Sequence, residues 1–271
     1  MNIKKLFLTI FFIAYSHSFL YAIEDPFNAY ILSIDNYSNG KLINIAIKDN
    51  IDLAGYPTTA GSEAILDNIA KNDAFIVKKL KQNGFHISGK TNLSEWANFR
   101  SEKSISGWSS HGGQTINPFG KNLNPCGSSS GSAVAVASGL VDVAIGTETN
   151  GSISCPASVN GIVGFKPTVG LVSRHGIIPI SSTQDTAGPM GKSVKLVAEV
   201  LEAIAGPDIK DTATLFIPKD FNYDFTSELQ NNNIAGKRLG LLRSGENYDV
   251  ASQLLEQITD LVNKLGGTVV E

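Results

Sequence analysis

The sequence predicts an α/β fold: a mixed, largely parallel sheet with helices on both faces. Apolar strand-like segments alternate with helix-like segments along the chain, an order that is typical of parallel strands joined by helical crossovers. The 271 residues are 42% hydrophobic and 17% charged, which is enough apolar material for one large domain with a sizeable core. The sequence shows neither an internal repeat nor a clear domain linker.

The first expected elements are a strand at 42–50, which runs into a turn, and a helix at 72–84. Asn72 or Asp73 is expected to cap the start of this helix, and Gly84 to end it. Further strands are expected at 85–92, 141–152, 237–245 and 268–271, and further helices at 193–206 and 249–267. The helix at 193–206 is amphipathic, with one apolar face formed by Val194, Val197, Leu201 and Ile204.

Residues 1–22 have the pattern of a secretory signal peptide. Two lysines precede an apolar run from Leu6 to about Tyr15, which is too short to cross the hydrocarbon core of a bilayer. Small residues follow, and cleavage after Ser18 or after Ala22 fits equally well. We therefore expect an exported protein, periplasmic or secreted, whose mature chain has no membrane span.

The charged, cysteine and histidine residues exclude several classes of function. The formal net charge of −3 offers no basic surface for nucleic acid. Two cysteines and three histidines of the mature chain show no metal-ligand spacing, so no metal or cofactor is expected. The histidines, which we interpret as structural, are His86, His111 and His175. A disulfide between Cys126 and Cys155 fits an oxidising compartment, but we expect two free, buried thiols.

A Gly/Ser run at 127–132 lies directly against an apolar, helix-compatible run that ends at Gly139. Flexible linkers seldom lead straight into core, and the run contains no G-x-x-x-x-G-K-[ST] phosphate motif. Lys48 ends the apolar strand at 42–50, where a lysine with a buried stem is a candidate for a lowered pKa. The alternative is a snorkelling lysine, or one paired with Asp49 or Asp52.

Three ordered segments resemble the hallmark segments of the amidase signature family of Ser-cisSer-Lys amide hydrolases. They are "IKDNIDLAGYPTTAGS", "PCGSSSGSAVAVASG" and "GTETNGSISCPASVNGIVGFKPTVGLVS". With "GKTNLSEWANFR" and "ISGWSSHGGQTINPFG", the resemblance covers about residues 40 to 206 and is closest to bacterial peptide amidases. It implies that residues 23–271 are the N-terminal part of a single amidase signature domain, because family members generally run longer, and that the fold lacks its C-terminal portion.

The resemblance also implies a mechanism. Lys48 would be the base, Ser128 the relay and Ser152 the nucleophile, with a cis peptide before Ser128. The backbone N–H groups expected to hold the tetrahedral oxyanion are those of Thr149, Asn150, Gly151 and Ser152. The remaining serines of the run, Ser129, Ser130 and Ser132, are expected to hydrogen-bond the loop and cap the following helix. No cofactor is implied.

The chain departs from the family pattern after the nucleophile. Many members have an arginine there, which some use to hold a small acid, whereas this chain has Cys155. We therefore expect a small uncharged amide or a peptide amide as substrate. An amidotransferase A-subunit-like protein is the alternative within the family, although such amidotransferases act in the cytosol, whereas this chain has the pattern of a signal peptide. An alternative of another class is a catalytically inactive fragment that pairs with a separately encoded C-terminal half.

Overall fold

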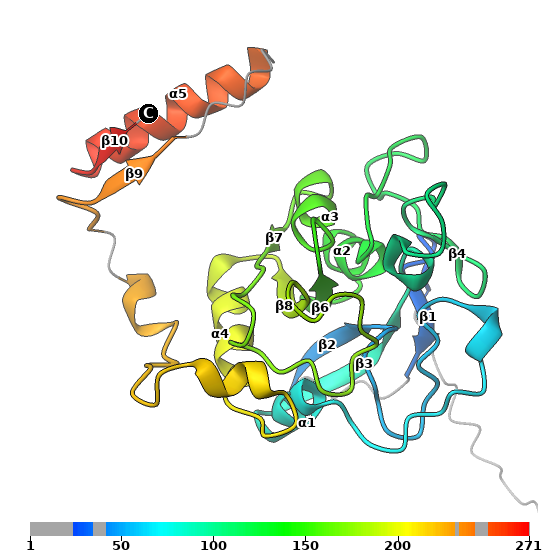
Figure 1. Ribbon diagram of the computed structural model, residues 1–271. Coiled ribbons are helices and arrows are strands. Elements are labelled where there is room, and N and C mark those ends of the chain that lie inside the picture. The colour runs from blue at the N-terminus through cyan, green and yellow to red at the C-terminus, as the bar shows by residue number, and fades with distance from the viewer. Residues whose placement is uncertain (1–23, 35–41, 231–232, 242–248, 271) are drawn as a thin grey trace, which may run out of the picture.

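The computed structural model describes residues 24–34, 42–230, 233–241 and 249–270, and the predicted signal peptide lies outside these ranges. A six-stranded sheet forms its centre, with the strand order β1-β3-β2-β6-β8-β7 (Figure 1). The strands of this sheet are β1 (Tyr30–Ser33), β2 (Ile43–Lys48), β3 (Phe85–Thr91), β6 (Val143–Glu148), β7 (Val163–Gly164) and β8 (Thr186–Gly191). The central strands β3, β2 and β6 are parallel, whereas β1 and β8 pair antiparallel with them, so the sheet is mixed as expected.

Helices cover both faces of the sheet. These helices are α1 (Phe75–Gln82), α2 (Ser130–Ala137), α3 (Ser154–Val159) and α4 (Val194–Ile204), and a fifth helix, α5 (Asp249–Lys264), lies outside this sheet. Short 3₁₀ helices lie at Glu63–Ile65, Glu95–Asn98, Thr212–Phe216 and Ser227–Gln230, and a small hairpin is formed by β4 (Trp108–Ser109) and β5 (Gly113–Gln114). None of the helices in the described residues is long and apolar enough to span a bilayer.

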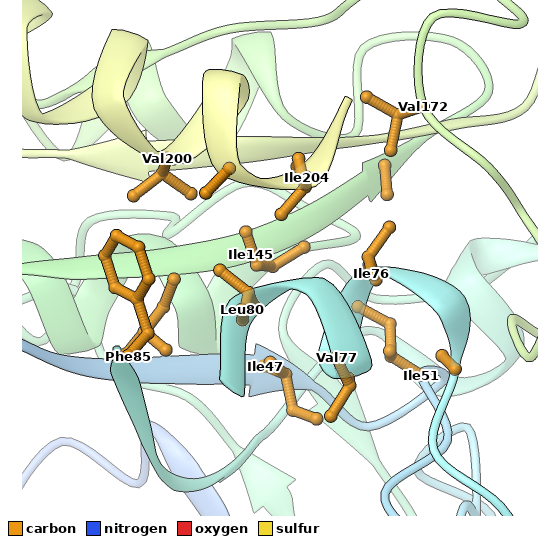
Figure 2. Packing of buried hydrophobic residues seen from close by; sticks show 14 of the residues in the cluster. Ile47, Ile51, Ile76, Val77, Leu80, Phe85, Ile145, Val172, Val200 and Ile204 are labelled. Atoms are coloured by element: carbon orange, nitrogen blue, oxygen red, sulfur yellow. The ribbon is translucent and has the colours of Figure 1, made fainter. Parts of the chain in front are cut away.

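Side chains alternate between the two faces of the central strands, as the pleat of a strand requires. Ile47 and Ile145 belong to the core beneath α1 and α4, where they pack with Leu80 and Ile204 (Figure 2). Ala46 and Ala144, one position earlier on each strand, belong instead to the core beneath α2. Lys48, two residues after Ala46, therefore faces the α2 side of the sheet, and that side carries the candidate site.

The helix α2 packs unusually close to the backbone of its neighbours. A Cβ atom at Gly131 would lie 2.3 Å from the Ala29 carbonyl oxygen and 2.4 Å from that of Asn92. Real Cβ atoms do not come so close to backbone, so position 131 requires glycine. The same closeness brings the start of α2, with its serines, onto the sheet beside Lys48.

The predicted cap of the first helix is wrong. The residue before α1 is Ala74, which has no capping side chain. Asp73, a predicted cap, instead accepts a hydrogen bond from the Ala54 N–H and pairs with Lys81. In α4, Ser193 caps the helix by accepting from the Leu196 N–H, and Val194, at the first position of the predicted apolar face, is left 58% exposed. The predicted stop at Gly84 is confirmed by its left-handed φ of 80°.

The last elements are β9 (Arg238–Gly240), α5 and β10 (Thr268–Val270), and they form a small unit of their own. β9 and β10 pair in parallel with each other and not with the six-stranded sheet. Figure 1 shows this unit apart from the body of the molecule. Its helix leaves apolar residues exposed, among them Leu254 (54%) and Leu261 (55%).

Candidate active site

The candidate site lies where the parallel strands end. β2 ends at Lys48, β3 at Thr91 and β6 at Glu148, so all three deliver polar residues to the same edge of the sheet. The carboxyl ends of parallel strands are the usual location of binding sites in α/β proteins. The chain continues from β6 into the turn at 149–152, and the start of α2 lies beside it.

Lys48 is completely buried, and hydroxyl groups surround its amine. Nζ lies 2.7 Å from Ser128 Oγ, 3.0 Å from Ser129 Oγ and 2.9 Å from Thr147 Oγ1. The Thr147 carbonyl oxygen is 3.3 Å away. Among the described ion pairs of the chain, none involves Lys48. The amine is therefore held by neutral partners, which can stabilise either of its protonation states.

Burial lowers the pKa of Lys48 from 10.5 to about 7. Removing an ammonium from water without a compensating anion disfavours its charged form. The carboxylates of Glu148 and Asp185 act in the opposite direction and raise this pKa, but they do not outweigh burial. A substantial fraction of Lys48 is consequently neutral near pH 7, which a general base requires.

The alternative interpretation of Lys48, as a lysine paired with an aspartate, does not hold in the structure. Asp49 faces away from Lys48 and pairs with another buried lysine, Lys90, at 3.0 Å. Lys90 Nζ also donates to the carbonyl oxygen of Pro57 at 2.8 Å. The anion next to Lys48 in sequence is thus used elsewhere, and Lys48 remains with its hydroxyl partners.

The Gly/Ser run is an ordered, buried loop leading into α2. The peptide bond between Gly127 and Ser128 is cis, as the resemblance implied. Ser128 is fully buried, and its carbonyl oxygen accepts from the Ser94 N–H at 3.1 Å. The Ser129 N–H donates to the Ser152 carbonyl oxygen at 3.2 Å. This hydrogen bond places the Ser128 loop directly against the segment that carries Ser152.

The other serines of the run bond neighbouring backbone rather than cap the helix. Ser129 precedes α2, but its side chain makes no cap hydrogen bond. Its hydroxyl instead donates to the Thr147 carbonyl oxygen at 3.0 Å and contacts Lys48. Ser130 Oγ bonds the Cys126 carbonyl oxygen and Ser132 Oγ that of Ile145. The expected loop bonding is confirmed, and the expected capping is wrong.

Glu148, which the sequence did not single out, shapes the turn at Ser152. Its Oε2 atom accepts from the N–H groups of Ile153 (2.7 Å) and Ser154 (2.8 Å), at the start of α3. Burial tends to raise the pKa of Glu148, but these hydrogen bonds, with others from the Gly151 N–H and the Ser154 hydroxyl, hold it below its usual value. An anion here is also favoured by the helix start. The sequence feature that could have indicated this role is an acidic residue at the end of a strand, four residues before a predicted nucleophile.

The turn at 149–152 brings together the four amides predicted to bind an oxyanion. Gly151 has a φ of 81°, a left-handed conformation that favours glycine. The Gly151 N–H is shared with Glu148, so it is the least available of the four amides. The Thr149 hydroxyl donates to Asp185 Oδ1 at 2.5 Å, which fixes the other end of the turn. Ser152 itself is 8% exposed.

The prediction of two free, buried cysteines is wrong. Cys126 and Cys155 form a disulfide with a Cα–Cα distance of 5.9 Å, and both are half-buried. They lie 29 positions apart, a separation that carries no signal of pairing by itself. Both flank the serine segments, which the fold brings together through α2 and β6. The pairing is therefore a tertiary effect that the sequence pattern did not contain.

Two adjoining cavities open beside the end of β6 and the turn that follows it. One, of about 260 Å³, is lined by Thr147, Glu148 and Thr149 and by the segment 177–182. The other, of about 280 Å³, is lined by Trp96 and Phe99. They share the wall formed by Asn50, Ile178, Pro179 and Ile180. The described residues contain no cluster of three or more His, Cys, Asp or Glu side chains that could hold a metal ion.

Known proteins resemble both the sequence and the structure. A family model described as Amidase matches residues 33–271. A solved structure of native peptide amidase from Stenotrophomonas maltophilia is 53% identical in sequence, with a TM-score of 0.81, over 86% of this chain and 49% of that chain.

Two curated relatives are also similar in sequence. A putative amidase from Arthroderma benhamiae is 45% identical, over 84% of this chain and 39% of its own length. A glutamyl-tRNA(Gln) amidotransferase subunit from Methanospirillum hungatei is 37% identical, over 91% of this chain and 56% of its own length. The chain thus spans about half the length of the relatives that it matches.

Proposed function

The chain belongs to the amidase family, and from that premise we propose that it hydrolyses a carboxamide C–N bond through an acyl-enzyme formed on Ser152. The observation that carries the proposal is the burial of Lys48 among hydroxyl groups, 2.7 Å from Ser128 Oγ. An amine in that environment is a base with a pKa of about 7, and Ser129, the residue after Ser128, is hydrogen-bonded to the Ser152 carbonyl oxygen.

In the proposed reaction, neutral Lys48 takes the proton of Ser128 while Ser128 takes that of Ser152. Ser152 Oγ then attacks the amide carbon, and the amide oxygen becomes an oxyanion. Backbone N–H groups of the turn at 149–152 bind this oxyanion, where loss of a single donor typically costs about 2.7–4 kcal/mol. The proton returns through Ser128 to the departing nitrogen, ammonia leaves, and water hydrolyses the acyl-enzyme by the same steps in reverse.

The proposed substrate is an uncharged or extended amide, such as a peptide with a C-terminal carboxamide. Cys155 is bonded to Cys126, so no charged side chain stands at this position to hold a small acid. The two adjoining cavities provide space for a chain longer than a small amide. Similarity to a peptide amidase supports this substrate, whereas the 37% identity to a subunit of an amidotransferase supports the alternative of an amide-transferring protein.

We also propose that the protein works outside the cytosol. The N-terminal pattern at 1–22 and the disulfide support export, because disulfides persist in oxidising compartments. A dipeptide amide or a longer peptide amide is accessible there, whereas charged tRNA is not.

The exposed apolar side chains of α5 support the proposal that a second polypeptide binds to this chain. Leu254, Ile258 and Leu261 are between 41 and 55% exposed, and the relatives are about twice as long. We propose that a C-terminal half, separately encoded, covers this surface and completes the active protein. The alternative is that residues 23–271 hydrolyse amides by themselves.

Ammonia release from a panel of amides tests the proposed function. The panel contains peptide amides, their free acids, small acid amides and fatty amides, and peptide amides are expected to react fastest. Ser152→Ala should abolish turnover, and Lys48→Ala combined with Ser128→Ala and Ser152→Ala should be little worse, since residues that act as a unit give non-additive losses. Unchanged turnover by Ser152→Ala would refute the assignment.

The same assay tests the partner. Residues 23–271 are assayed alone and then with the C-terminal half of a relative supplied in trans. Activity that appears only with the second polypeptide supports a split enzyme, whereas full activity and cooperative melting of 23–271 alone contradict it.

A further inference from the structure

The disulfide joins the two segments that carry the candidate catalytic serines. Cys126 lies two positions before Ser128, and Cys155 lies three positions after Ser152, in the first turn of α3. The chain contains only two cysteines, so this is its single covalent cross-link.

Hydrogen bonds and a small buried cluster connect the same two segments in the described part of the chain. The Ser129 N–H donates to the Ser152 carbonyl oxygen at 3.2 Å, and Asn160 Nδ2 donates to the Pro125 carbonyl oxygen at 2.9 Å. The helix α3, which holds the Ser152 segment in place, has only six residues. Such short helices have little stability of their own. Ala133 of α2 also packs with Ile153 and Ala157, so the disulfide adds a covalent link to a junction that packing and hydrogen bonds hold.

We infer that the Cys126–Cys155 disulfide is a positioning device that holds the Ser128 loop against the Ser152 turn and makes the hydrolytic rate depend on its oxidised state. The inference rests on the proposed function of these serines. Proton relay and nucleophilic attack need hydrogen-bonding distances, and a displacement of about 1 Å can lower a catalytic rate about 100-fold. The two cysteines act through the serines and touch no substrate.

Reduction of the bond by a dithiol is chemically simple. A thiolate of the dithiol attacks one sulfur, the S–S bond breaks, and the second thiolate closes the cyclic disulfide of the reagent. Two protons and two electrons thereby pass to Cys126 and Cys155, which become thiols. Both residues are half-buried in the folded protein. The Ser128 loop and α3 are then connected only by hydrogen bonds and packing.

The first experiment compares oxidised and reduced protein at a temperature where circular dichroism shows both to be folded. The protein is residues 23–271, with the C-terminal half in trans if activity requires it. Dithiothreitol should lower kcat about 10- to 100-fold, with KM changed less than about threefold, and reoxidation should restore kcat. A merely structural cross-link would lower activity only in proportion to the folded fraction, and that result would overturn the inference.

The control is Cys126→Ser combined with Cys155→Ser, which removes the bond and both thiols. This variant should have the low kcat of the reduced protein and no response to dithiothreitol. If it has the kcat of the oxidised protein, the disulfide does not position the serines.

Hydrogen exchange gives a second measurement that requires no activity. The amide of Ser129, which bonds Ser152, and the amides of 149–155 should exchange about tenfold or more faster after reduction, whereas that of Ile45 in β2 should not change. If wild-type protein releases no ammonia in either state, the proposed function fails, and exchange alone decides whether the disulfide holds the two segments together. Unchanged exchange of the Ser129 amide would overturn the inference.

Discussion

Lys48 and Lys90 are both completely buried and lie on neighbouring strands, yet they have opposite surroundings. Lys90 is the register partner of Ile47 and shares its face of the sheet, where the Asp49 carboxylate lies 3.0 Å from its amine. Lys48 projects to the α2 face and meets the hydroxyl groups of Ser128, Ser129 and Thr147.

The two lysines differ in their partners rather than in their burial, and our proposal assigns their different roles to this difference. Burial lowers the pKa of both amines, and Asp49 opposes this effect directly at Lys90. Lys90 and Asp49 form a buried ion pair, and breaking such a pair by removing one partner is costly. A lysine with neutral partners can release its proton near neutral pH and serve as a base.

Replacing each lysine by methionine should separate these roles most strongly. Lys48→Met should lower kcat/KM for amide hydrolysis about 100- to 10,000-fold, the range typical of losing a general base. Lys90→Met leaves Asp49 buried without its cation and should lower the free energy of unfolding by about 3–5 kcal/mol. Activity assays and urea unfolding of both variants measure the two effects.

A matched control keeps this comparison interpretable. Adding Asp49→Asn to Lys90→Met removes the unpaired charge and should recover part of the lost stability. If Lys48→Met proves as unstable as Lys90→Met and keeps its rate while folded, the division of roles is wrong.

The pH dependence of hydrolysis should follow the protonation of Lys48. Below its pKa of about 7 the amine is charged and cannot take a proton, so kcat/KM should fall roughly tenfold per pH unit on the acid side and level off above about pH 8. The measurement is kcat/KM for a peptide amide from pH 5 to pH 9. A profile that is flat from pH 5 upward would indicate a different base.

Glu148→Gln should shift this profile modestly. The Glu148 carboxylate raises the pKa of Lys48, so its removal should lower that pKa and move the midpoint to lower pH, by less than about one unit. Asp49→Asn is the control, since Asp49 pairs with Lys90, and its midpoint should stay in place. A shift of the Glu148→Gln midpoint to higher pH would contradict the electrostatic account.

A third lysine gives the smallest expected effect. Lys192 pairs with Asp142 at 2.8 Å, but its side chain is 47% exposed and that of its partner 66%. Exposed pairs contribute little, so Lys192→Ala should change the free energy of unfolding by about 0.5 kcal/mol or less and leave the pH profile unchanged. A loss as large as that of Lys90→Met would show that burial does not separate these pairs.

The sequence predicted the elements whose patterns are local. The alternation in β2, the apolar stripe of α4 and the glycine at the end of α1 all reflect interactions within a few residues. Strand β8 was missed because its sequence, with two glycines and Pro189 between them, resembles a turn. It forms because tertiary pairing with β6 and β7 outweighs its poor strand propensity.

The candidate site, like the fold, was predicted in part from the sequence. The resemblance of ordered segments named Lys48, Ser128 and Ser152, and the structure brings their segments together at one edge of the sheet. Glu148 and the disulfide were missed because their partners are set by the fold: the start of α3 for one, and a cysteine 29 positions away for the other. The roles of the named residues remain predictions.

Titration of Lys48 by NMR tests the central claim most directly, because it needs no substrate and no second polypeptide. Protein labelled with ¹³C at lysine Cε is titrated from pH 5 to pH 11, and the Lys48 signal is assigned by its absence in Lys48→Met. The account predicts a Lys48 midpoint near pH 7, about three units below an ordinary lysine. A Lys48 signal that stays in its charged form up to pH 10 would contradict the proposal that this residue is the base.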